Sequence, residues 1–416
     1  MKINSLKLEN FRGISKQEFI FDNKCTVFFG VNGVGKSTVL RAINLLYSSI
    51  INKIVRYRFK QGINIQVEDI KFGAMNCRIS SNIMLDNDQE FRYGRYMKRN
   101  SKDRTHNKEG LDELFAKFDS LYIDEEDKNM PMYANYSVNR TVIDIPLRIV
   151  NRHTFDKLSA FEKAIESKID FRTFFEWFRN QEDYENQIKA RDNNDYVDIQ
   201  LESVRTAILT MLDGFSHLRI ERNPLRMAIK KGDVTLRVEQ LSDGEKCTLA
   251  MIGDLARRLA LANPSLKNPL EGRGIVLIDE IELHMHPTWQ RRIIKTLRTT
   301  FPNIQFFITT HSPQVLGEIG EEINIYQLST ENNKFECIKI NSLDAWDSNY
   351  ILEGFMETSS LNLDTKGEIA RMYELIDEKN YDEAKIFVDK LERKTDSAHE
   401  DVVKARILIA RGQKGK

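Results

Sequence analysis

The stretch FFGVNGVGKSTVLR, from Phe28 to Arg41, decides the fold of this chain. It reads as the end of an apolar strand, a glycine-rich turn and the start of a helix, and its G-x-x-x-x-G-K-S spacing is that of a P-loop. Glycines in such a turn let consecutive backbone N–H groups point at phosphate oxygens, and the helix adds the positive end of its dipole. The stretch predicts that the chain binds a nucleoside triphosphate.

Each position of this motif has a predicted role. We expect Lys36 to reach the β- and γ-phosphates and Ser37 to offer its hydroxyl to Mg²⁺. Further nucleotide contacts are expected from the turn and the first helical residues, namely Gly30, Asn32, Gly33, Gly35 and Thr38. The alternative is a chance glycine-rich turn, and a motif in full register after an apolar strand counts against it.

Composition limits the classes of protein to which this chain can belong. The 416 residues are 41% hydrophobic, which is enough to bury a core, and 62 Lys and Arg balance 62 Asp and Glu. Bulk charge therefore argues neither for nor against a nucleic-acid partner, and such a surface would have to be a local patch. The four cysteines form no C-x-x-C pair, which counts against disulfides and a zinc site. No apolar run is long enough to span a bilayer, so we expect a cytoplasmic chain without a membrane partner.

The order of predicted elements indicates an α/β fold. Alternating strands at the N-terminus lead into the P-loop strand, and after Leu241 apolar strands alternate with helices, as in a largely parallel sheet covered on both faces. Between these parts, apolar residues recur at helical spacing from Phe155 to Phe215. We expect residues 1–150 to form the N-terminal part of the nucleotide-binding head, 151–215 an inserted helical lobe, 216–340 the rest of the head and 341–416 a C-terminal helical extension.

A second motif is the apolar strand Ile275–Ile278 followed by Asp279 and Glu280. A P-loop enzyme needs carboxylates opposite its phosphate loop. Asp279 would hold Mg²⁺ through its water shell, and Glu280 would activate the attacking water, a role that contributes about 10²–10⁴-fold. The alternative is a strand end with two solvated carboxylates.

A third motif is LSDGEK, from Leu241 to Lys246. Gly244 allows close backbone approach, Ser242 can hydrogen-bond a phosphate oxygen, and the helix that starts here presents free N–H groups. Glu245 completes the predicted nucleotide contacts. The same residues could also be an ordinary helix cap.

A fourth motif, TTHSP, follows the apolar strand that ends near Thr309. His311 would hydrogen-bond the γ-phosphate or polarise the attacking water, so that it senses whether that phosphate is present. The alternative is a buried structural histidine. The position of His311 in a cluster of groups whose pKa values can be shifted favours the functional interpretation.

In this order, the four motifs resemble those of ABC-type ATPases of the SMC/RecF/overcoming-lysogenization group, whose LSGGQ-like signature would be LSDGE here. The resemblance implies an ABC-type P-loop head in which the signature of one subunit completes the ATP site of another, so that a homodimer encloses ATP. It also implies that Glu280 is the base, that His311 is the switch residue and that Arg12, in LENFRGI, lies near the nucleotide. DEIELHMHP stands where the D-loop of that group lies, although His284 and His286 beside Glu282 could instead ligate zinc.

A narrower resemblance is to PtuA, the ATPase subunit of Septu-type anti-phage systems, and to ATPases that accompany some retrons. It depends on YSVNR (Tyr136–Arg140), FFEWFRNQEDYEN (Phe174–Asn186) and the tail motifs DSNYILEGF and YELIDEKNYDEAK. The resemblance implies a higher oligomer and a partner, the small HNH nuclease PtuB, that does the cutting. After His311 the chain lacks the Glu and Asp-x-Asp pattern of a Toprim nuclease, so we expect no nuclease activity in this chain.

Three features allow more than one interpretation. A charged stretch, Asp86–Gly110, is predicted to be an exposed loop that either binds nucleic acid or is simply solvated. Its cations and aromatic residues are Arg92, Tyr93, Arg95, Tyr96, Lys98, Arg99, Lys102 and Arg104. The C-terminal helices could dock a partner or cap the fold. Gln61, Gln66 and Gln89 are all candidates for the Q-loop.

The favoured hypothesis is a cytoplasmic ATPase that dimerises around ATP and Mg²⁺ and controls an associated HNH nuclease. The alternative is a DNA-repair or DNA-clamping ATPase of the RecF kind that acts on DNA directly. A self-sufficient nuclease and a membrane-transporter ATPase are disfavoured, the first by the missing Toprim carboxylates and the second by the large insert between P-loop and signature.

Overall fold

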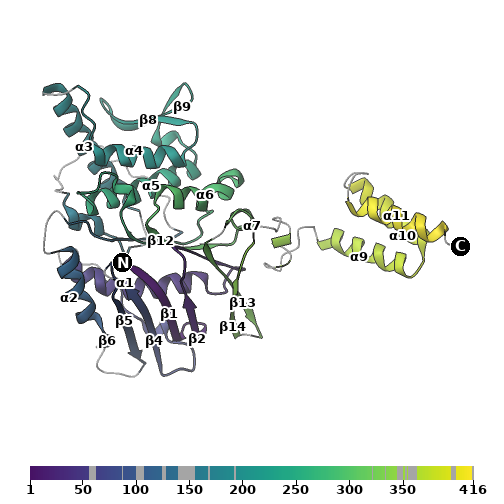
Figure 1. Cartoon of the computed structure of the whole chain (residues 1–416). Coiled ribbons are helices and arrows are strands. Elements are labelled where there is room, and N and C mark those ends of the chain that lie inside the picture. Colours follow the sequence, from purple (N-terminus) through teal and green to yellow (C-terminus); the bar gives the residue numbers. More distant parts are fainter. Residues whose placement is uncertain are drawn as a thin grey trace. The chain divides into compact units, whose positions relative to one another are not determined.

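The computed structural model divides the chain into two compact units, Met1–Ser348 and Asn349–Lys416, each with its own core (Figure 1). It describes residues 1–55, 62–86, 88–99, 107–123, 128–138, 155–166, 169–191, 194–320, 322–332, 334–343, 350–351, 354, 363–394 and 400–414. None of the helices in these ranges is long and apolar enough to cross a membrane.

A six-stranded sheet lies at the centre of the first unit, in the order β14-β13-β3-β12-β11-β7. Its strands are β3 (Cys25–Phe29), β7 (Met132–Tyr136), β11 (Gly274–Ile278), β12 (Ile304–Thr310), β13 (Ile323–Glu331) and β14 (Lys334–Ile340). All neighbours are parallel except β14, which pairs antiparallel with β13. The carboxyl ends of β3, β12 and β11 therefore meet at one edge, where ligands bind in open α/β sheets.

Helices cover both faces of this sheet, as β7 shows. The ring of Tyr133 stacks on Tyr47 of α1 (Lys36–Ile54), with 4.9 Å between ring centroids. Three residues along the strand, the hydroxyl of Tyr136 donates to Asp254 of α5 (Asp243–Ala262) at 2.9 Å. Residues three apart in a strand point to opposite faces. The structure confirms the predicted α/β fold class.

A second, antiparallel sheet packs against α1 in the order β2-β1-β4-β5-β6. Its strands are β1 (Lys2–Phe11), β2 (Ile14–Ile20), β4 (Asn76–Met84), β5 (Glu90–Lys98) and β6 (Asn107–Glu109). The buried side chain of Arg95 links the two layers, because its Nη1 donates to the carbonyl of Leu45 and to Ser48 Oγ on α1. Nearly every residue of α1 from Val39 to Ile51 is buried between the layers.

The prediction of an exposed charged loop over 86–110 is wrong for the described part of this stretch. β5 pairs with β4 along its whole length, and its alternation turns Phe91, Tyr93 and Arg95 inward. Arg95 is 1% exposed and also donates to Ile63 and Asn64, in a segment that leads into a 3₁₀ turn (Val67–Asp69). Tyr93 and Arg95 are therefore unavailable to nucleic acid. The predicted contacts Lys102 and Arg104 lie outside the described residues.

The helices expected between 155 and 215 pack on α5. They are α3 (Phe171–Arg191) and α4 (Ile199–Met211), and Gly253 of α5 makes room for the ring of Phe174, which a Cβ would meet at 2.7 Å. Arg205 of α4 bridges Glu182 and Glu185 of α3. A three-stranded antiparallel sheet follows, formed by β8 (Phe215–Arg222), β9 (Leu225–Lys231) and β10 (Val234–Arg237).

The remaining helices complete the two units. In the first unit these are α2 (Leu111–Tyr122), α6 (Pro287–Thr300) and α7 (Pro313–Leu316), with 3₁₀ turns at Lys157–Phe161, Val238–Gln240 and Pro269–Glu271. The second unit consists of α9 (Leu363–Asp377), α10 (Tyr381–Lys394) and α11 (Glu400–Lys414), which bury a core of their own. The helices predicted after residue 341 are therefore present.

We expect Arg95→Ala to lower the free energy of unfolding by about 2–4 kcal/mol, because it removes buried charged hydrogen bonds and leaves carbonyls unpaired. Equilibrium urea denaturation would measure the loss. Arg92→Ala is the matched control, since Arg92 is exposed on the same strand and its loss should change stability by no more than about 0.5 kcal/mol. Equal effects of the two substitutions would contradict the buried position of Arg95.

Candidate nucleotide-binding site

The glycine-rich turn lies between β3 and α1 and is held by close backbone packing. Gly30 has φ +145°, and a Cβ there would lie 2.1 Å from the carbonyl oxygen of Leu328 in β13. Gly35 caps α1 with φ +106°, and Gly33 has φ +85°. Only glycine adopts these conformations readily. The neighbouring Asn32 is exposed at the tip of the turn.

Lys36 lies under this turn and is 6% exposed. Its Nζ donates to the carbonyl oxygens of Gly30, at 2.8 Å, and Val31, at 3.0 Å. Burial lowers the pKa of Lys36, and the nearby carboxylates of Glu280, Glu282 and Asp279 oppose that shift. The ammonium group is therefore held by the backbone of the turn, and the carboxylates after β11 favour its charged form.

Asp279 connects the P-loop helix to the sheet edge. Ser37 Oγ donates to Asp279 Oδ1 at 3.0 Å, and Thr309 Oγ1 donates to the same oxygen at 2.5 Å. A hydroxyl and a carboxylate side by side are the hard oxygen donors that Mg²⁺ accepts beside phosphate oxygens. Thr309 was not singled out from the sequence, although it is the first threonine of the TTHS motif. Thr38, in the first turn of α1, donates its backbone N–H to the carbonyl oxygen of Gly35 at 3.0 Å.

Glu280 begins the loop after β11 in the left-handed region, with φ +47°. Its backbone N–H donates to Thr309 Oγ1 at 2.8 Å, so one threonine orients both Asp279 and Glu280. The charge of Glu280 opposes the burial that lowers the pKa of Lys36, and it adds to the rise that Glu282 causes in the pKa of His311. A left-handed non-glycine residue costs free energy and is typical of functional sites.

His311 follows β12 and pairs with Glu282. Its Nδ1 lies 2.9 Å from Glu282 Oε1, and its backbone N–H donates to the same oxygen at 2.7 Å. The carboxylate of Glu282 raises the pKa of His311 above its ordinary value. Burial would raise the pKa of Glu282, but hydrogen bonds from His311 lower it. Glu282 was considered only as a zinc ligand, and its role as the partner of His311 depends on tertiary structure.

The zinc alternative finds no support in the described part of the chain. His286 caps α6, since its Nδ1 accepts from the backbone N–H of Thr288 at 3.3 Å. Within the described residues no group of three or more His, Cys, Asp or Glu could hold a metal ion.

The LSDGE motif forms the start of α5. Ser242 Oγ accepts from the backbone of Glu245, and Glu245 Oε2 accepts from the backbone N–H of Ser242 at 2.8 Å, which is a capping box. Glu245 also pairs with Lys231 at 2.6 Å. A Cβ on Gly244 would lie 2.3 Å from the carbonyl oxygen of His284, so this helix start packs on the loop that follows Glu280.

Arg12 belongs to a cluster beside α1. Its Nε lies 2.8 Å from Asp69 Oδ1, and Arg41, one turn after Ser37, binds the same carboxylate with two hydrogen bonds of 2.9 Å. Burial would raise the pKa of Asp69, but these hydrogen bonds lower it. Gln66, one Q-loop candidate, donates its backbone N–H to Asp69 at 3.1 Å. Of the other candidates, Gln89 lies in the β4–β5 turn and residue 61 is outside the described ranges.

Comparison with known proteins places the chain in a family. The profile of the family described as "AAA domain, putative AbiEii toxin, Type IV TA system" matches residues 25–317. The chain belongs to this family. It is similar to the Retron Ec83 probable ATPase of Escherichia coli, with 31% identity over 86% of this chain and 77% of that protein. It is also similar to the Retron Vc95 probable ATPase of Vibrio cholerae, with 28% identity over 77% of this chain and 72% of that protein.

The chain has two further similarities, one to a Septu protein and one to a solved Smc head structure. Septu protein PtuA of Bacillus thuringiensis is 23% identical over 85% of this chain and 84% of its own. Among solved structures, an Smc head bound to the C-winged helix domain of ScpA matches with a TM-score of 0.51 and 16% identity, over 83% of this chain and 98% of that chain. These findings confirm an ABC-type ATPase of the SMC/RecF group that is similar to PtuA. The roles of the individual site residues stay predictions.

The pair His311–Glu282 predicts a pH dependence. We expect the imidazole of His311 to titrate above its ordinary value of 6.5, and Glu282→Gln to remove this rise. Because the folded state favours the protonated ring, the pair contributes its full stability below that value and loses it as the pH rises through the raised pKa. NMR titration of the ring would measure the pKa.

The corresponding stability measurement is the difference in Tm between wild type and His311→Gln. That difference should shrink as the pH rises from below 6.5 through the raised pKa of His311, and in the Glu282→Gln background it should shrink much less. A pH-independent difference would contradict the ion pair.

Proposed function

We propose that the chain binds ATP with Mg²⁺ at the edge where β3, β12 and β11 end, and hydrolyses it. The contact between Ser37 Oγ and Asp279 Oδ1, at 3.0 Å, carries this proposal. This contact supports the proposal because Ser37, which follows the predicted phosphate-binding turn, and Asp279, the predicted metal carboxylate, are far apart in the sequence. The family of the chain supports nucleotide hydrolysis in general.

Each residue near this point has a proposed task. Lys36 and the N–H groups of the turn bind the phosphates, and Ser37 and Asp279 would hold Mg²⁺, which neutralises charge on the phosphates when bound. Glu280 orients and deprotonates the attacking water. His311, held by Glu282, would report on the γ-phosphate.

We propose that the signature acts in trans. Ser242 is exposed at the N-terminus of α5, where the N–H groups of a helix can bind an anion. A nucleotide that bridges two copies favours the closed dimer by RT ln(1 + [L]/Kd), about 4 kcal/mol at a thousandfold excess over Kd. The backbone contact between Gly244 and His284 supports a coupling between the two ATP sites of such a dimer. It connects the signature of each copy, which completes the opposite site, to the loop that carries Glu280 of the same copy.

The biological role that we propose is anti-phage defence. It rests on the similarity to retron ATPases and to PtuA of a Septu system. In this role the chain would form a dimer or a larger oligomer and restrain or release a small HNH nuclease according to its nucleotide state. The second candidate is a RecF-like ATPase that clamps DNA directly, which the Smc-head fold favours. DNA-stimulated hydrolysis by the purified chain alone, with steep salt dependence, would support that candidate.

Glu280→Gln tests the base. We expect ATP turnover to fall at least about 10²-fold, because a general base contributes that much, while ATP still binds and the dimer persists. Phosphate release and analytical ultracentrifugation with ATP would measure the two effects. Glu318→Gln, an exposed carboxylate of the same unit, should leave both unchanged. Wild-type turnover in Glu280→Gln would remove Glu280 from the mechanism.

Ser242→Arg tests the site completed in trans. The substitution should leave ATP binding intact and stop hydrolysis, because it blocks the signature of the opposite copy. Mixing Ser242→Arg with Glu280→Gln should restore roughly a quarter of wild-type turnover, since half of the dimers then hold one intact site. Mixtures that stay inactive would count against completion in trans.

A further inference from the structure

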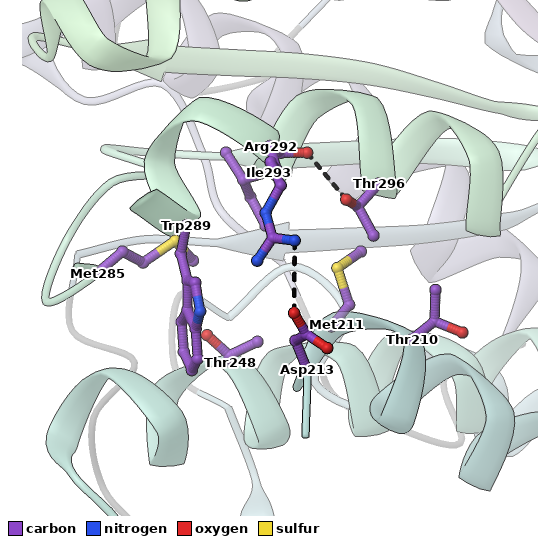
Figure 2. Close-up of a pocket in the computed structure, with 9 residues that line it drawn as sticks. All are labelled: Thr210, Met211, Asp213, Thr248, Met285, Trp289, Arg292, Ile293 and Thr296. Carbon is purple, nitrogen blue, oxygen red and sulfur yellow. Dashed lines mark hydrogen bonds and ion pairs between the residues drawn. The ribbon is translucent and has the colours of Figure 1, made fainter. Parts of the chain in front are cut away.

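A pocket of about 180 Å³ lies between α4, α5 and α6, away from the P-loop (Figure 2). Three of its walls come from the end of α4, the first turns of α5 and the first turns of α6. It is lined by Thr210, Met211, Asp213, Thr248, Met285, Trp289, Arg292, Ile293 and Thr296. None of the proposed steps of ATP hydrolysis uses these side chains.

The interior of the pocket suits a flat ring. Met211, Met285 and Ile293 are buried and apolar, and the indole of Trp289 stands along one side (Figure 2). A dry cavity of about 150 Å³ in another protein holds benzene, so this volume has room for one small ring system. Methionine side chains adapt to planar ligands, and an indole face stacks on them.

One polar group inside the pocket lacks a partner. The side chain of Thr248 is 2% exposed, and its hydroxyl makes no hydrogen bond with any described residue. Buried hydroxyls are nearly always satisfied, because an unsatisfied one costs free energy. A valine would fill the same space without that cost. Thr248 therefore points to a ligand that supplies a donor or an acceptor.

The mouth of the pocket is charged. Arg292 and Asp213 lie 3.5 Å apart across it and are 54% and 73% exposed (Figure 2). The sequence of α6, PTWQRRIIKTLRTT, contains four cations and no acidic residue. Arg291 contacts Gln314, Arg298 faces Glu322 at 3.6 Å, and Lys295 has no ion pair among the described residues. Of these four cations, Arg292 alone lines the pocket, and it stands at the mouth beside Asp213.

We propose that this pocket binds one nucleobase, with the attached phosphate on Arg292 of α6. Trp289 stacks on the base, the Thr248 hydroxyl hydrogen-bonds its edge, and Arg292 contacts the phosphate. The carboxylate of Asp213 accepts from an exocyclic amino group, so cytosine and adenine bind better than thymine. Such a base comes either from a free mononucleotide or from a single strand that follows α6.

The pocket touches two elements of the proposed ATPase, the signature helix α5 and the loop after β11. Thr248 lies one turn after Gly244 on α5, and Met285 follows His284 in the loop that packs on Gly244. A base held between them would stabilise one relative position of the signature helix and that loop. The site would thus make ATP turnover respond to a nucleic acid or a nucleotide, although base binding itself does not depend on the P-loop.

The test is a binding measurement in the Lys36→Ala background, which removes the P-loop as a competing site. Fluorescence anisotropy would compare a labelled deoxycytidine decamer with a decamer of the same length built from abasic residues. We expect the deoxycytidine strand to bind more tightly, and Trp289→Ala to weaken it roughly 5- to 100-fold and abolish the difference between the two strands. Arg292→Gln should reduce the salt slope of binding by about 1.

Controls separate this site from general basicity and from misfolding. Trp289→Phe keeps a stacking ring and should bind nearly as well as the parent, and Arg237→Gln, an exposed arginine on β10, should change nothing. Unlabelled cytidine monophosphate, added as a competitor, identifies where the bound base comes from. If it displaces the labelled strand at micromolar concentration, the natural ligand is a free nucleotide; if it does not, the ligand is a single strand. Equal affinity for the two strands, or an unchanged affinity in Trp289→Ala, overturns the proposal without bearing on ATP hydrolysis, which the Glu280→Gln assay addresses.

Discussion

The interaction on which the rest of the site depends is the hydrogen bond from Ser37 to Asp279, supported by Thr309. It exists because β3, β12 and β11 are adjacent and parallel, so that the residues after each strand reach the same edge. Once these strands are in register, Lys36 and Glu280 follow as immediate neighbours of the bonded residues. The chemistry at this edge is thus a property of strand order more than of any single loop.

The loop after β11 carries the second constraint. Glu282 binds the side chain and the backbone of His311, and the carbonyl of His284 packs against Gly244. A displacement of this loop would therefore change the environment of His311 and the position of the signature helix together. This shared loop gives a physical route between the γ-phosphate region and the surface that we propose meets the partner copy.

Local chemistry explains what the sequence predicted well. The turn around Gly30 and the carboxylates after β11 are each defined by a few consecutive residues, and the fold class follows from the alternation of apolar strands and helices. Contacts between distant residues were not predictable in this way. Glu282 as the partner of His311, Asp69 between two arginines, and the burial of Arg95 all depend on which strands and helices lie side by side. The prediction for Arg95 was wrong because the residues around it have the composition of a solvated loop, whereas the pairing of β5 with β4 turns its side chain inward.

The tight packing of Gly30 on β13 has a consequence for how this family can change over time. The atom that excludes a Cβ at position 30 is a main-chain oxygen, which every amino acid at position 328 carries. No second substitution on β13 can relieve the clash, so drift cannot compensate for a loss of this glycine. A larger residue at position 30 would have to displace the main chain of β13 itself, so the shape of the phosphate turn depends on a site that tolerates no side chain.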